Sequence, residues 1–167
     1  MTETLALVES PAQFLHVLEW AHAEQVADRT RVAVLAPADP ASVAQLRALN
    51  DFADEEGIAV TWHAPREGGL AGVRTVAALR PVVSSARRLV IGDPFSGMVQ
   101  ALLPFSRAAE AVVVDDGTAT LEFAAQFTHG EPLQRWHAGL ALVRRPLAAH
   151  ARRFLTERRL DPRLERL

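Results

Sequence analysis

Residues 4–11 read TLALVESP, a short, largely apolar run that leads directly into Ser10 and Pro11. Serine is a preferred helix N-cap and proline is favoured at the first helical position, so a helix is expected to begin here. Apolar residues then recur at spacings of three and four, at Phe14, Val17 and Leu18, which is the pattern of one buried helix face. The stretch predicts a buried strand that turns at once into an amphipathic helix.

The same unit recurs along the chain. Four further apolar runs lie at 31–36, 58–63, 88–91 and 111–114. Amphipathic stretches between them predict helices at 42–55, at about 70–83, where Pro81 is expected to kink or shorten the helix, and at 97–102. Apolar strands that alternate with helices are typical of a parallel sheet covered on both faces. We therefore predict an α/β fold, a Rossmann-like doubly wound sheet of about five mainly parallel strands with helices on both faces. The residues expected in its core are Leu5, Leu7, Val32, Val34, Val60, Val90, Ile91, Val112 and Val114.

The C-terminal part of the chain has a different charge. Residues 144–167 hold eight arginines and three acidic residues, a net charge of +5, whereas the preceding part carries about −7. Residues 120–127 fit either a helix or an edge strand, and the chain after Pro132 is typical of helix, with a break near Pro146. We predict a Rossmann-like domain at 1–143 and an Arg-rich helical extension at 144–167. This extension is either a solvated or acid-facing surface of a terminal helix, or an element that docks on the acidic body of a second subunit or on a missing domain. We predict a homodimer.

Composition narrows the possible functions. The 167 residues are 49% apolar, which suits one compact domain, and the net charge of −2 gives no support to nucleic-acid binding. The chain has no cysteine and no lysine, which excludes disulfides, Fe–S clusters and Schiff-base chemistry. No apolar run approaches the ~20 residues needed to span a bilayer, so we expect a soluble, cytoplasmic protein. The six histidines form no metal-binding motif, so we expect neither a metal nor a cofactor; His63, which ends a predicted strand, has the best claim to a ligand-facing rim.

Candidate site residues follow the predicted strands, because ligands of open α/β sheets bind outside the carboxyl ends of the strands. Asp115, Asp116, Gly117 and Thr118 come directly after a buried strand. Two adjacent carboxylates raise the pKa of at least one of them, which suits a general base, and Gly117 allows a ligand close approach. The alternative is that one of the two aspartates caps the next helix.

Two other loops are candidates of the same kind. Gly92, Asp93, Ser96 and Gly97 form a turn after the fourth predicted strand, where Ser96 could cap a short helix whose N–H groups attract an anion. An ordinary turn explains the same residues. The Ser10 hydroxyl could also face a ligand, although N-capping accounts for it.

Residues 112–121, VVVDDGTATL, resemble the strand and acidic-acidic-glycine motif of bacterial GT-B sialyltransferases and polysialyltransferases, including glycosyltransferase family 52. Residues 9–13 and 92–97 are similar to other short motifs of that group, so the resemblance covers residues 4–125. It implies the N-terminal, acceptor-side domain of a glycosyltransferase. Asp115 would then be the base that deprotonates the acceptor sugar as CMP leaves, with Asp116 and Gly117 shaping its loop.

The chain departs from this family at one important point. Its members hold the CMP-sugar donor in a second, C-terminal domain with a His-Pro motif, and none of the six histidines here precedes a proline. We therefore expect a missing C-terminal half, by natural absence or by truncation, and no transfer by the chain alone. The alternative is a non-catalytic Rossmann-like module that binds a ligand or forms a dimer. A phosphatase or phosphoacceptor domain is less favoured, because only Glu9 provides an acid after the first strand.

Overall fold

The computed structural model describes residues 3–114, 118–133 and 141–160. These residues form six strands and six α-helices, which alternate along the chain except that two helices precede the last strand. Two short 3₁₀ turns lie at Ala27–Arg29 and Leu103–Phe105. In chain order the elements are β1 (Thr4–Val8), α1 (Pro11–Ala23), β2 (Thr30–Leu35), α2 (Pro40–Glu55), β3 (Ala59–His63), α3 (Ala71–Ser85), β4 (Arg88–Ile91), α4 (Gly97–Leu102), β5 (Glu110–Val113), α5 (Thr118–His129), α6 (Ala141–Thr156) and β6 (Arg159–Leu160).

The strands form one parallel sheet in the order β3-β2-β1-β4-β5-β6. This arrangement confirms the predicted α/β, doubly wound fold. The two-residue strand β6 is an addition to the five predicted strands, and it pairs Arg159 with Glu110 of β5. The Nε of Arg158 donates to the carbonyl oxygen of Ala108 at 2.8 Å, and this bond holds the end of α6 against the edge of β5.

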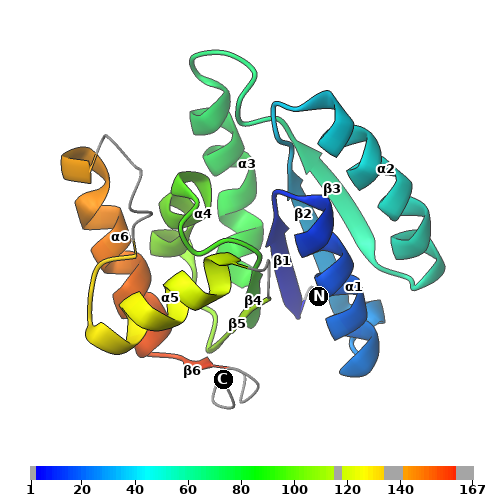
Figure 1. The fold of residues 1–167 in the computed structure, drawn as a ribbon. Coiled ribbons are helices and arrows are strands. Elements are labelled where there is room, and N and C mark those ends of the chain that lie inside the picture. Colours follow the sequence, from blue (N-terminus) through cyan, green and yellow to red (C-terminus); the bar gives the residue numbers. More distant parts are fainter. Residues whose placement is uncertain (1–2, 115–117, 134–140, 161–167) are drawn as a thin grey trace.

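Helices cover both faces of the sheet (Figure 1). Helices α1 and α2 pack on one face, against strand residues such as Val8 and Val32. Helices α3, α4, α5 and α6 pack on the other face, against residues such as Leu7 and Ile91. Every predicted core residue is buried except Val60, which is half-buried because β3 lies at the edge of the sheet.

The structure decides three points on which the sequence predicted an interrupted helix or left a choice between helix and strand. Helix α3 continues through Pro81 to Ser85, and α5 is a helix rather than an edge strand. The predicted break near Pro146 is wrong, because α6 runs through this residue. Both prolines are exposed while the apolar residues beside them pack into the core, and burial of an apolar face outweighs the hydrogen bond that a proline cannot make.

Helix α6 contributes to the same core as the sheet. Its residues Ala151, Phe154 and Leu155 are buried beside residues of α3 and α4, whereas Arg145 and Arg153 face solvent. Within the described residues, no helix is long and apolar enough to cross a membrane.

Candidate functional site

The switch point of the sheet lies between β1 and β4. From β1 the chain builds outward to β2 and β3, then crosses back to β4 and β5 on the other side. The loops after β1 and β4 therefore meet at the carboxyl edge, where ligands of such sheets bind. The fifth strand lies beside the fourth, so the loop that follows it starts from the same edge of the sheet. The Val114 N–H donates to the Ile91 carbonyl at 3.0 Å, so this pairing extends to the residue before Asp115.

A cleft of about 360 Å³ opens at this edge. It is lined by Glu9 after β1, by Pro65 and Arg66 after β3, and by five residues after β4, which are Asp93, Phe95, Ser96, Gly97 and Met98. The structure thus brings the predicted residues Asp93, Ser96 and Gly97 together in one hollow. The predicted residues Ser10 and Gly92 belong to the same two loops but do not line the cleft.

Arg66 is the main residue of this cleft that the sequence motifs miss. Its Nη2 donates to Glu9 Oε1 at 2.8 Å, and its Nη1 donates to the carbonyl oxygens of Ala36 at 3.0 Å and Leu35 at 3.4 Å. One guanidinium therefore spans the end of β2 and reaches the end of β1. The Glu9 side chain is 11% exposed, whereas that of Arg66 is 42% exposed, so the pair is buried on the carboxylate side. The rule that sites follow strands also applies to the loop after β3, and would have found Arg66.

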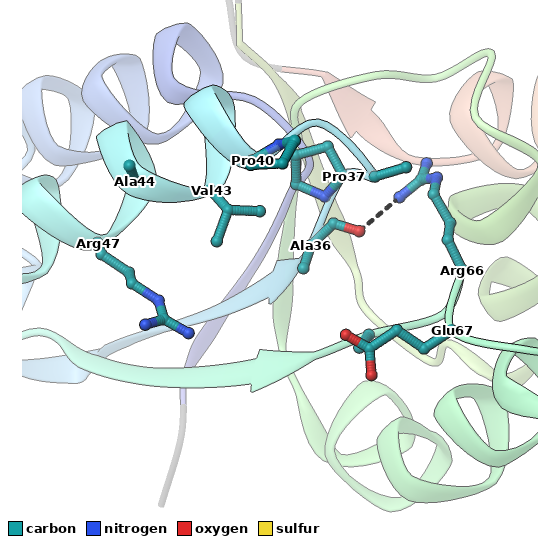
Figure 2. A pocket seen from close by; sticks show the side chains of 10 residues that line it. Ala36, Pro37, Pro40, Val43, Ala44, Arg47, Arg66 and Glu67 are labelled. Atoms are coloured by element: carbon teal, nitrogen blue, oxygen red, sulfur yellow. Dashed lines mark hydrogen bonds between the residues drawn. The ribbon is translucent and has the colours of Figure 1, made fainter.

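A second hollow, of about 570 Å³, lies between the loops after β2 and β3 and the start of α2 (Figure 2). Arg66 lines both hollows and so stands between them. Arg47 of α2 and Glu67 of the loop after β3 extend from opposite sides of the second hollow. Its remaining walls are mostly small and apolar, and include Pro37 and Val43.

His63 lines neither hollow. Its Nε2 lies 3.3 Å from the Thr61 hydroxyl, and partial burial lowers the pKa of its ring. His63 was predicted to face a ligand at the rim, and neither of the two hollows supports that prediction.

Three predicted binding side chains make the local bonds that the alternative interpretation gives them. The Ser10 hydroxyl accepts from the Gln13 N–H at 3.3 Å and caps α1. The Ser96 hydroxyl accepts from the Val99 N–H at 3.3 Å and caps α4, and Asp93 Oδ1 accepts from the Phe95 N–H at 2.8 Å. These bonds shape the turn that forms one wall of the cleft.

Gly92 has a packing reason to be glycine. A Cβ at this position would lie 2.4 Å from Gln13 Oε1 and 2.9 Å from Gln13 Cβ. The Gln13 side chain is buried, and its Oε1 accepts from the Glu9 N–H at 2.8 Å. The Gly92 N–H donates to the Leu7 carbonyl at 3.0 Å. Because Gly92 has no side chain, α1 can approach the end of β4. The two elements therefore pack closely at the switch point, beneath the cleft.

The predicted catalytic residues Asp115 and Asp116, together with Gly117, lie outside the described residues. Thr118 is the first residue of α5. In the described part of the chain, no group of three acidic or imidazole side chains could hold a metal ion. No family model matches the sequence, and no curated protein matches it.

Proposed function

We propose that this chain is the acceptor-side domain of a sialyltransferase-like glycosyltransferase, with Asp115 as the general base. The observation that carries the proposal is the order β1-β4-β5 at the switch point. The Asp-Asp-Gly motif follows β5, and the loop after the neighbouring β4 forms a wall of the 360 Å³ cleft. A base that starts from the end of β5 is therefore one strand away from a hollow that opens on the same edge.

The cleft has the hydrogen-bonding groups that a sugar needs. Sugar hydroxyls both donate and accept, carboxylates accept, and a guanidinium donates, so Glu9, Asp93 and Arg66 suit a polyhydroxylated ligand. In the proposed reaction the acceptor oxygen bonds to the anomeric carbon of the donor. The bond from that carbon to the CMP phosphate breaks, and the hydroxyl proton passes to Asp115. In the enzymes that the motif resembles, a second domain holds the CMP-sugar donor.

Acceptor binding is tested by titrating the ¹⁵N-labelled chain with galactosides and sialylated oligosaccharides. We expect saturable shifts at the amides of Ser96 and Gly97 and weaker binding by the Arg66→Ala variant. The Val73→Ala variant is the matched control, because Val73 is exposed on α3 and lines neither hollow. If no glycan perturbs the carboxyl edge, the acceptor role is wrong and a non-catalytic interaction module is the better interpretation.

The base is tested with the complete product of the reading frame that encodes this chain. Asp115→Asn should sharply reduce transfer from CMP-sialic acid while acceptor binding and the unfolding transition stay unchanged, because the amide cannot accept the proton. Val73→Ala is the control and should transfer at the wild-type rate, because Val73 is exposed on α3 and lines neither hollow. Transfer by Asp115→Asn at the wild-type rate would remove the assignment.

We also propose that the chain forms a homodimer through the Arg-rich part of α6. Arg145 and Arg153 face solvent there and could meet the acidic body of a second copy. Light scattering at tens of micromolar should then show a dimer that dissociates as salt screens the contact. A monomer at every salt concentration would contradict this assembly.

A further inference from the structure

A groove runs between α1 and α2 on the outer side of the molecule, away from the carboxyl-edge cleft. The two helices lie side by side on one face of the sheet (Figure 1). The groove, of about 530 Å³, is lined by Leu15, Leu18, Glu19, His22, Leu49, Phe52, Glu55 and Glu56. Within it Phe52 is 58% exposed and Leu15 is 44% exposed. Two large apolar side chains on one hollow are the kind of surface that partners bind.

The rim of this α1–α2 groove is acidic. It carries Glu19, Glu55 and Glu56, and the one basic group among its lining residues is His22, whose Nδ1 lies 3.0 Å from Glu56 Oε2. Among the described residues, neither Glu19 nor Glu55 forms an ion pair. The rim thus presents carboxylates that a cation could pair.

The acidic residues at the end of α2 oppose the preference of the helix itself. Asp51, Asp54 and Glu55 lie in its last two turns, Glu56 is its C-cap, and its last turn holds no basic residue. A helix C-terminus carries partial negative charge and favours cations, so these carboxylates are placed unfavourably for the isolated domain. A basic partner would remove this repulsion as it binds.

A second copy of the chain does not fit the groove. Two grooves face to face would bring carboxylates against carboxylates. Helix α6 offers arginines, but its bulky apolar residues Phe154 and Leu155 are buried in its own core. Among its described exposed positions it has no large apolar side chain to place beside Phe52.

We propose that the α1–α2 groove binds a basic amphipathic helix of another protein. Its apolar side chains, spaced at i, i+3, i+4 and i+7, pack on Phe52 and Leu15, and its arginines or lysines pair with the glutamates of the rim. The apolar contact provides affinity, whereas the charges set orientation and association rate. This inference stands independently of the proposed glycosyl transfer.

The test uses a labelled synthetic peptide of about 18 residues, with leucines at those spacings and arginines on the flanks. Fluorescence anisotropy should show saturable binding to the full chain, weakening as salt is raised. Phe52→Ala should reduce affinity about tenfold or more, since a central apolar anchor is lost. Glu19→Gln combined with Glu55→Gln should weaken binding at low salt and flatten its salt dependence.

Two controls make the result specific. A peptide of the same composition, with its leucines permuted so that they share no helix face, should not bind. The Val73→Ala variant, which removes an exposed side chain of α3, should bind like the wild type. Equal binding of both peptides, or unchanged affinity in Phe52→Ala, would overturn the proposal. Self-association of the chain that Phe52→Ala abolishes would overturn it in favour of a second copy.

Discussion

Replacing Gly92 by alanine tests the close packing of Gln13 against Gly92 at the switch point. The added methyl would lie 2.4 Å from Gln13 Oε1, 2.7 Å from Gln13 Cδ and 2.9 Å from Gln13 Cβ, all closer than normal contact. Because Gln13 is buried between α1 and β4, its side chain has little room to withdraw. Overpacking of this kind costs about 1–3 kcal/mol, and any shift of Gln13 that relieves it weakens the bond from the part-buried Glu9 N–H.

We therefore expect Gly92→Ala to lower the free energy of unfolding by about 2 kcal/mol, measured by urea denaturation. For a chain of this size the same change lowers the melting temperature by about 4–8 °C. Gly69→Ala is the control, because a Cβ there meets nothing within 4 Å, and it should be nearly neutral.

A double-mutant cycle with Gln13→Ala identifies the cause. Truncating Gln13 removes the two closest atoms from the new methyl, although its Cβ remains. The combined cost should therefore be about 1 kcal/mol less than the sum of the single costs. Additive costs, or a Gly92→Ala variant as stable as the wild type, would refute the steric explanation.

Four further results are expected. Val112→Ala should lower the free energy of unfolding by about 1–3 kcal/mol in urea, since Val112 is buried in the sheet and a cavity remains. Ser96→Ala should cost about 1 kcal/mol in the same assay through loss of the α4 cap. Burial lowers the pKa of the His63 ring in the folded protein below its ordinary value of 6.5. The stability that depends on the neutral ring is therefore fully present above pH 6.5 and is lost as the pH falls below 6.5. His63→Gln should flatten the stability curve in that range. Hydrogen bonds from Ser42 lower the pKa of Asp39 below its ordinary value of 3.8, so this stabilisation is present above that value and is lost as acid protonates the folded protein. Asp39→Asn, which caps without titrating, should remove that dependence in melting curves across the acid range.

Much of the fold could be predicted because its signals are local. The strand 4–8 is a single buried run, and the start of α1 has both an N-cap serine and an N1 proline, so each is set by its own residues. The strand β6 has only two residues and no apolar run. It depends on α6 returning the chain to the edge of β5, which no local pattern announces. Pro146 was misleading for the same reason, because packing of distant residues keeps α6 intact around it.

Part of the candidate site could also be predicted from local sequence, and part of it could not. The residues after β4 were found because a rule about strand ends points to them. The contact between Arg66 and Glu9 joins residues 57 positions apart, and a three-dimensional structure is needed to see it. The role of Gly92 depends on the position of Gln13 on a neighbouring helix, so the sequence alone suggested ligand contact where the structure shows close packing.

The close packing of Gln13 against Gly92 also affects how much conformational entropy the protein loses when a ligand binds in the cleft. The buried Gln13 amide accepts from the Glu9 N–H after β1 and packs closely against Gly92 after β4. The floor of the cleft is therefore ordered before a ligand arrives, and holding it in place on binding costs little further entropy. The opposite wall depends on the partly exposed side chain of Arg66, which has the rotamer freedom of a long surface residue. We therefore expect the Arg66 side chain to change conformation when ligands of different shape bind, while the floor of the cleft keeps its conformation.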